Sequence, residues 1–446
     1  MTNKRIRAVS LVLAILALAG CSSSYQATLP APEMPLVQEH STNEQKTTNM
    51  GLSLSDTLIL DEAISRSLAS NPELQVLKSE IKASEAHTLQ QSLLPNPELV
   101  IELENFTGSG PLSGFKGTEP TIAIGQLIEL GGKRAKRTKI AARQSDLTLL
   151  RYEIKRLEII TKVRSIFTQV LAAQMKLNLD RQLLGIAERF KATIDTLVHA
   201  GRFSVAEASR AQVELSNRKL ARQQSIRELN NSKRLLASIW GSNTVNFTRV
   251  AGDLFTIRAL PEPEWLLGAL ENSPRIIEQN AVITSRKAET ELARAQAIPD
   301  PVFIAGYRRF NQTDDEAFIA GLSVPLPIFD RNQGGKKEAL FRELQSEQQM
   351  QNLRNLLSAE LNIRMENLQN FSTEIQTMRN VIIPEAQKAY DIIYKNYRLG
   401  NYAIIDVLDA QRQLFDAEGR YIDNLARINL EIIEVEGILG QSLKSF

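Results

Sequence analysis

The chain contains two related stretches, GRFSVAEASRAQVEL at residues 201–215 and GNYAIIDVLDAQRQL at residues 400–414. At a constant offset of 199 residues they share the glycine, an aromatic residue, an acidic residue, the Ala-Gln pair and the final leucine. The same offset aligns Ile239-Trp240-Gly241 with Ile438-Leu439-Gly440. A constant register over such a distance indicates that a unit of about 200 residues has been duplicated.

Both units show the same order of expected elements. Apolar residues recurring at three and four predict an opening helix at about 55–94 and again at about 262–297. A pair of short strands comes next, then a very long helix, a turn at Gly201 or Gly400 and a return helix. We expect the strands at about 98–106, 119–128, 301–310 and 317–325, and the long helices at 132–199 and 335–397. Pro384 predicts a local kink in the second long helix.

The expected strands are long enough to cross a bilayer when tilted, which takes about 9–11 residues. Four strands cannot close a barrel, and open strand edges cannot face lipid, so a spanning sheet requires several copies of the chain. The alternative is a structural antiparallel coiled coil whose two hairpins do not span a membrane. The alternation of apolar Leu99, Ile101 and Leu103 with Glu102 and Glu104 favours the membrane interpretation.

The N-terminus reads MTNKRIRAVSLVLAILALAGC, a basic segment followed by an apolar core of about eleven residues. This core is too short to span a bilayer and is typical of a signal peptide. The sequence before Cys21 resembles a bacterial lipobox, which implies a lipid-modified Cys21 and, with Ser22 following, an outer-membrane location. An ordinary signal peptide with an incidental cysteine is the alternative. The expected divisions are a signal peptide (1–20), a leader (21–54), the first repeat (55–241), an equatorial linker (242–261) and the second repeat (262–446).

The composition predicts neither an enzyme nor a bound cofactor. The chain has one cysteine, and its three histidines, His40, His87 and His199, match no metal-ligand spacing. Without residues 1–20 it carries 50 Lys and Arg against 51 Asp and Glu, a balance that gives no indication of nucleic-acid binding. We interpret the basic run from Lys133 to Lys139 as a solvated first helical turn.

The lipobox, the duplicated helix–hairpin–helix plan and both glycine turns together resemble the TolC family of outer-membrane export ducts, over nearly the whole mature chain. The stretches NPELVIELENF and EPTIAIGQLIELGGKR resemble its CzcC-type branch, which serves heavy-metal efflux. This resemblance implies a mainly α fold with a small transmembrane β part. It implies a homotrimer with a 12-stranded barrel in outer-membrane lipid and an α-helical tunnel of coiled-coil helices. The implied partners are a periplasmic adaptor and an inner-membrane pump of the resistance-nodulation-division type, with the chain a passive conduit.

By the same resemblance, Asp406, Asp409 and Glu207 point into the lumen at its narrowest point. Residues three apart share a helix face, and three-fold symmetry would turn each acid into a ring that attracts cations. The alternative is that these carboxylates only favour the positive end of a helix dipole.

The resemblance also makes the two tip turns the adaptor contact, through Gly201, Phe203, Leu399, Gly400 and Tyr402. A basic residue that latches the closed tip in related ducts is missing two places after Gly400, although Arg398 is close enough in sequence to replace it. A duct for drugs or other small molecules and a periplasmic scaffold lipoprotein are the competing functions.

Overall fold

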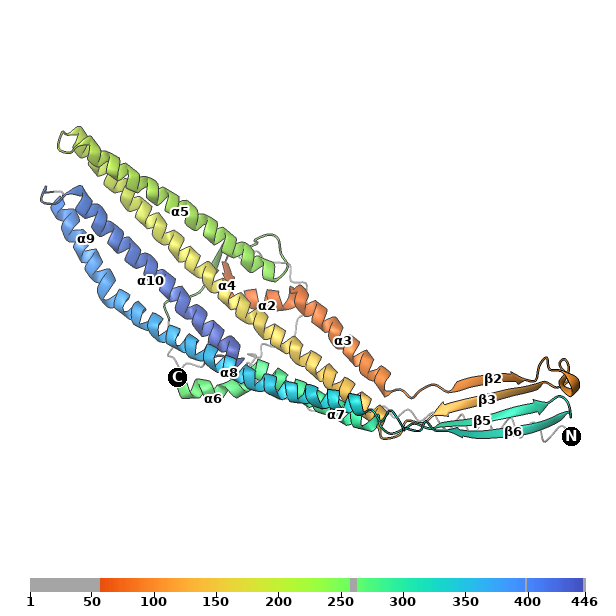
Figure 1. Ribbon diagram of the computed structural model, residues 1–446. Helices are drawn as coiled ribbons and strands as arrows, with labels where there is room; N and C mark the ends of the chain where they lie inside the picture. The colour runs from red at the N-terminus through yellow and green to blue at the C-terminus, as the bar shows by residue number, and fades with distance from the viewer. Residues whose placement is uncertain (1–56, 257–262, 398, 444–446) are drawn as a thin grey trace, which may run out of the picture. The chain divides into compact units, whose positions relative to one another are not determined.

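The computed structural model describes residues 57–256, 263–397 and 399–443. Cys21, the expected signal peptide and leader, and Arg398 lie outside the described residues. The predicted fold class is confirmed, because long helices dominate and four strands form one sheet (Figure 1). The helices are α2 (Leu60–Ser70), α3 (Pro72–Ser92), α4 (Lys133–His199), α5 (Val205–Ile239), α6 (Pro263–Ala269), α7 (Pro274–Ala295), α8 (Gln333–Thr377), α9 (Ile383–Tyr397) and α10 (Ile404–Leu439). The strands are β1 (Thr57–Ile59), β2 (Glu98–Glu104), β3 (Glu119–Leu127), β4 (Arg249–Ala251), β5 (Val302–Phe310) and β6 (Asp315–Ser323).

The expectation of one continuous opening helix in each repeat is wrong. The first is divided into α2 and α3 at Asn71, and the second into α6 and α7 by a 3₁₀ turn (Leu270–Asn272) and Ser273. Proline at the first position of α3 and of α7 disfavours a helical conformation in the residue before it, so a new helix begins there.

At the break in each repeat, a hydrogen bond connects the beginning of the repeat to its end. The Asn71 amide donates to the carbonyl of Ile239 (2.8 Å), and the Ser273 hydroxyl donates to the carbonyl of Ile438 (2.7 Å). The glycines that follow, Gly241 and Gly440, have positive φ. The shared motifs therefore mark a closure that recurs in both copies.

The long helices form a layer in the order α5, α4, α10 and then α8 with α9 (Figure 1). With 67 residues, α4 is on the order of 100 Å long. The second long helix is interrupted by a π-helical turn, Met378–Ile382, just before Pro384. This irregularity lies where the proline removes a backbone donor from the helix.

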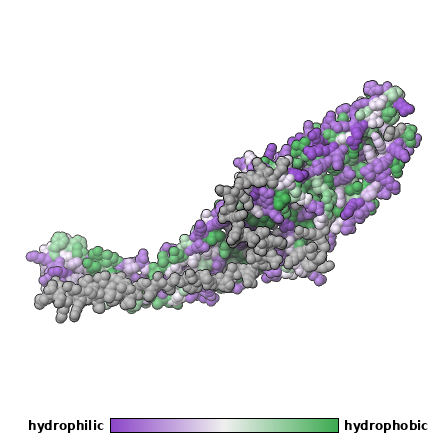
Figure 2. All heavy atoms as spheres, turned by 180° about the vertical axis from the view of Figure 1, so that it is seen from behind, coloured by the Kyte–Doolittle hydropathy of each residue, from purple (hydrophilic) through white to green (hydrophobic). Residues whose placement is uncertain are grey.

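The sheet has the order β2-β3-β5-β6 with all neighbours antiparallel. The register places Ile101, Ile122, Tyr307 and Phe318 in one row across the four strands. This face is exposed and apolar, and Figure 2 shows hydrophobic surface along the strands in the view it gives. On the opposite face Arg308 donates to Thr121 Oγ1 (2.8 Å) and pairs with Glu104 (2.8 Å). A sheet with an exposed apolar row on one face and the ion pair of Arg308 on the other suits lipid on the first side and water on the second.

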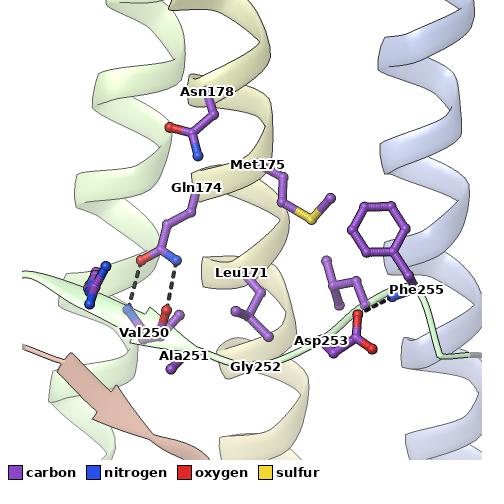
Figure 3. Close-up of a pocket in the computed structure, with 11 residues that line it drawn as sticks. Leu171, Gln174, Met175, Asn178, Val250, Ala251, Gly252, Asp253 and Phe255 are labelled. Carbon is purple, nitrogen blue, oxygen red and sulfur yellow. Dashed lines mark hydrogen bonds between the residues drawn. The ribbon is translucent and has the colours of Figure 1, made fainter.

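A short parallel pair, β1 with β4, lies beside the middle of α4. The Gln174 amide holds β4 there, because its Nε2 donates to the Val250 carbonyl (3.0 Å) while its Oε1 accepts from the Val250 N–H (2.8 Å; Figure 3). A pocket of about 390 Å³ lies between this segment and α4, lined in part by Leu171, Met175 and Phe255. Among the described residues, no helix combines the length and the apolar character needed to cross a membrane.

The interpretation of the basic run as a solvated turn is wrong for Lys133. Its side chain is buried, and Nζ donates to the Ile298 carbonyl (2.5 Å) and pairs with Asp300 (2.7 Å). Arg137 pairs with Glu129 in the same region. The run therefore joins the base of the first hairpin to the second repeat, a contact that local sequence cannot reveal.

Candidate functional site

The two tip turns, residues 200–204 and 399–403, have closely similar geometry. Gly201 has φ +70° and Gly400 has φ +86°, and each N–H donates to a carbonyl three residues back at 2.9 Å. No atom lies within 4 Å of the position that a Cβ would take at either glycine. Backbone conformation therefore demands glycine at both turns, and close packing does not.

Two of the three predicted lumen acids cap the helices that begin after these turns. Glu207 Oε2 accepts from the Ser204 N–H (2.8 Å), and Asp406 Oδ2 accepts from the Ala403 N–H (2.9 Å). Each is the third residue of its helix, the position from which a carboxylate satisfies a free N–H at the helix start. Ser204 adds a hydroxyl contact to Glu207 (3.3 Å), which Ala403 has no group to make. Both half-buried acids thus have a local structural role.

Asp409 differs from this pair. It is exposed, lies one turn further into α10 and accepts only from Gln413 Nε2 (2.8 Å) in the hydrogen bonds of the described chain. Its helix position corresponds to Arg210 in the first repeat, which is also exposed. Of the three predicted acids, Asp409 is the one whose carboxylate is not engaged in a cap.

A cluster of aromatic side chains joins the two hairpins beneath the turns. Tyr397 is buried, and its ring centroid lies 5.1 Å from that of Phe203 and 6.2 Å from that of Phe190. Tyr390 and Tyr394 stack with centroids 5.7 Å apart. The sequence interpretation missed this cluster, although Tyr390, Tyr394 and Tyr397 follow the spacing of one helix face.

Burial raises the pKa of two tyrosines in this cluster. Burial, with a further contribution from the negative charge of Glu207, raises the pKa of Tyr397 well above its usual value. Burial likewise raises the pKa of Tyr390 to about 12. A phenol is already neutral at physiological pH, so burial only moves ionisation to still higher pH, and the cluster acts as apolar packing.

The predicted adaptor contacts divide in two. Phe203 is turned inward and is half-buried against Tyr397. Leu399 and Tyr402 remain 69% and 41% exposed. Two apolar residues that the sequence interpretation did not select, Val205 and Ile405, are 73% and 54% exposed beside them. Local sequence gave no sign of which apolar residues face outward.

Within the described residues, no group of three or more His, Cys, Asp or Glu side chains is placed to hold a metal ion. The tip presents carboxylates and exposed apolar side chains, which can line a passage or contact a partner.

Comparison with known proteins gives consistent matches. The profile of the family described as "Outer membrane efflux protein" matches residues 63–242 and 265–441. The cobalt-zinc-cadmium resistance protein CzcC of Cupriavidus metallidurans is 29% identical, over 86% of this chain and 90% of that protein. The probable outer membrane lipoprotein SilC of Salmonella typhimurium is 24% identical, over 92% of this chain and 93% of that protein. The crystal structure of the outer membrane protein VceC of Vibrio cholerae has the same fold, with a TM-score of 0.73 at 16% identity, covering 86% of this chain and 97% of that one.

Proposed function

Because the chain belongs to the outer membrane efflux protein family, we propose that it is the outer-membrane channel of a tripartite system that exports heavy-metal cations. The family consists of outer-membrane channels, so the protein is a conduit and not an enzyme. Energy for transport then comes from its partners.

The metal substrate rests on one observation, the similarity to a cobalt-zinc-cadmium resistance protein across most of both chains. Deleting the gene should lower resistance to cobalt, zinc, cadmium, copper or silver salts, and the full-length chain should restore it. Susceptibility to dyes and antibiotics serves as the control. If deletion sensitises cells equally to dyes and antibiotics, the protein is a general export duct and the metal assignment is wrong.

A homotrimer would cover the strand edges and the apolar helix surfaces that a single copy leaves exposed. The outer edges of β2 and β6 have no partner strand among the described residues. At the other end α5 packs chiefly on α4 and exposes Val213 and Leu220, while α8 exposes Ile363. Three copies would pair the strand edges into a 12-stranded barrel and bring α5 of one copy against α8 and α9 of the next. Heat-modifiable migration of the purified protein tests this; a monomer after solubilisation in mild detergent would refute it.

The assignments at the tip belong to the same proposal. Asp409 would line the lumen with a carboxylate that caps no helix, and Asp406 and Glu207 would lie beside it while capping their helices. Leu399 and Tyr402, with Gly201 and Gly400 shaping the turns, would meet the hairpin of a periplasmic adaptor that links the channel to an inner-membrane pump. Phe203 would support this surface from within. Lipid attachment at Cys21 would anchor the chain to the outer membrane.

A further inference from the structure

A buried lysine joins the two repeats of one chain at the base of the sheet. Lys133 Nζ donates to the Ile298 carbonyl (2.5 Å) and pairs with Asp300 (2.7 Å). The other oxygen of this carboxylate accepts from the Leu130 N–H (2.8 Å). Gly131 allows the two segments to approach, because a Cβ there would lie 2.7 Å from Ile298 Cδ1. The start of α4 is therefore fixed to the segment that leads into β5.

Both sides of this contact recur in the duplicated sequence. The motif Gly131-Gly132-Lys133 returns as Gly334-Gly335-Lys336. The segment Ile298-Pro299-Asp300-Pro301 has the twin Leu94-Pro95-Asn96-Pro97, which leads into β2. An asparagine thus stands where the second repeat has the aspartate that binds the lysine.

Helix packing places the two lysine motifs at corresponding heights. In the first repeat the hydroxyls of Ser84 on α3 and Ser145 on α4 lie 3.0 Å apart, and in the second Lys287 on α7 pairs with Glu347 on α8 (3.6 Å). These partners are 203 residues apart on the opening helices and 202 on the long helices. The two lysines are 203 residues apart. Lys336 therefore occupies the place on α8 that its twin occupies on α4.

Within one copy, Lys336 has no counterpart of the segment that its twin binds. The helices nearest the sheet pack in the order α3, α4, α7 and α8, so α8 is the last of the row (Figure 1). Lys336 is half-buried and makes no ion pair with any described residue. No atom lies within 4 Å of the position that a Cβ would take at Gly334, the second residue of α8. Gly334 has no positive φ, so its own chain gives no reason for glycine where alanine is the better helix former.

The twin segment is exposed at the opposite end of the same row. Leu93 and Leu94, between α3 and β2, are 50% and 60% exposed, and Asn96 is exposed beside them. One end of the row thus presents a lysine with an open glycine beside it. The other end presents the kind of segment that such a lysine binds within the chain.

We infer that Lys336 of one copy binds residues 94–97 of the next copy. Its Nζ donates to the Leu94 carbonyl and to the Asn96 side-chain oxygen, as Lys133 does to the twin residues of its own chain. The inference rests on the proposed homotrimer, in which pairing of β6 with β2 of the next copy brings the two segments together. Three contacts within chains and three between chains then alternate around the base of the barrel. Because asparagine is uncharged, the contacts between copies are the weaker set.

Cysteine crosslinking in the full-length protein tests this contact. Lys336→Cys combined with Asn96→Cys should be joined by a short bifunctional thiol reagent, so that denaturing gels show covalent dimers and trimers. Glu338→Cys with Asn96→Cys is the matched control and should give far less product, because Glu338 is exposed about 200° further around α8. The reagent is also applied to the unchanged protein, since Cys21 is the only other cysteine in the chain.

The outcomes separate the contact from the homotrimer. Heat-modifiable trimers in which neither pair crosslinks, or both crosslink equally, would overturn the contact and leave the homotrimer standing. A protein that migrates as a monomer in mild detergent would refute both.

Stability measurements give an independent test. Asn96→Asp supplies the carboxylate of the within-chain contact and should slow dissociation of the trimer in detergent on the order of tenfold, an effect that Lys336→Gln should abolish. Gly334→Leu fills the place that Leu94 of the next copy would take and should lower the yield of trimer severalfold. Gly268→Leu, at another exposed helical glycine with open surroundings, should not. Equal effects of Asn96→Asp with and without Lys336, or normal assembly of Gly334→Leu, would contradict the inference.

Discussion

Replacing Asp406 and Asp409 one at a time should separate helix capping from cation selection. Asp406→Ala removes the carboxylate that accepts from the Ala403 N–H at 2.9 Å, which costs about 1 kcal/mol at a helix start. Amides in the first turn of α10 should then exchange with solvent roughly fivefold faster. Asp409→Ala loses only an exposed contact to Gln413, worth a few tenths of a kcal/mol, and should leave exchange almost unchanged.

Cation selectivity should depend more on Asp409 than on Asp406, which is the reverse of the order expected for hydrogen exchange. A cation about 6 Å from each of three Asp409 carboxylates in water gains about 1 kcal/mol after screening by 0.1 M salt. Because the same ring repels an anion by a similar energy, Asp409→Ala should lower the cation-to-anion permeability ratio by about thirtyfold, whereas Asp406→Ala should change it less than twofold.

Hydrogen-exchange mass spectrometry and reversal potentials in a salt gradient measure the two effects on the same preparations. Glu207→Ala is the internal control, because Glu207 caps α5 as Asp406 caps α10 and should behave alike in exchange. If Asp406→Ala shifts the reversal potential as strongly as Asp409→Ala without faster exchange, the capping explanation is wrong. An unchanged reversal potential for Asp409→Ala would remove that residue from the lumen.

Three other substitutions test the packing of the tip, the sheet and the chain end. Tyr397→Ala should cost about 3–5 kcal/mol by opening a cavity in the aromatic cluster and should raise proteolysis of the tip. Tyr397→Phe should be near neutral, because the hydroxyl has no hydrogen-bond partner among the described residues. Ile101→Arg places a charge on the apolar face and should cost about 2–4 kcal/mol at mid-membrane depth. It should therefore reduce the yield of heat-modifiable trimer, whereas Glu98→Arg on the opposite face should not. Equal losses of trimer would refute the assignment of the two faces. Arg164→Ala removes the guanidinium that pairs with the buried Glu436 carboxylate, so we expect a loss of about 3 kcal/mol in a thermal unfolding scan. An unchanged transition would show that the other contacts of Glu436, among them the hydrogen bonds from Ser442 and Leu443, suffice.

The duplicated motifs predicted the architecture well because they record local requirements. Gly201 and Gly400 need a backbone conformation that glycine adopts most readily, and the alternation in β2 reflects a sheet with unlike faces. The breaks at Asn71 and Ser273 were present in the repeated X-Pro motifs, but the helical periodicity on either side concealed them. The basic run was misread at Lys133 because its partner, Asp300, is 167 residues away.

The site was predicted less completely than the fold. Glu207, Asp406 and Asp409 look equivalent in the sequence, but in the structure Glu207 and Asp406 cap their helices while Asp409 accepts from the Gln413 side chain. Phe203 and Tyr402 occupy twin positions, yet Phe203 packs inward on Tyr397 while Tyr402 remains exposed. The difference between Phe203 and Tyr402 depends on which helix lies beside each turn, whereas the hydrogen bonds of the three carboxylates join residues three or four positions apart.

By itself, the sequence determined the duplication, the order of helices and strands, and the glycine turns, because periodicity and backbone preference act over a few residues. Only the tertiary structure decided which aromatic ring is buried, which apolar residues of the tip remain exposed, and that Lys133 pairs with Asp300. These properties arise from contacts between segments far apart in the chain, and their energies depend on distances that no local pattern encodes.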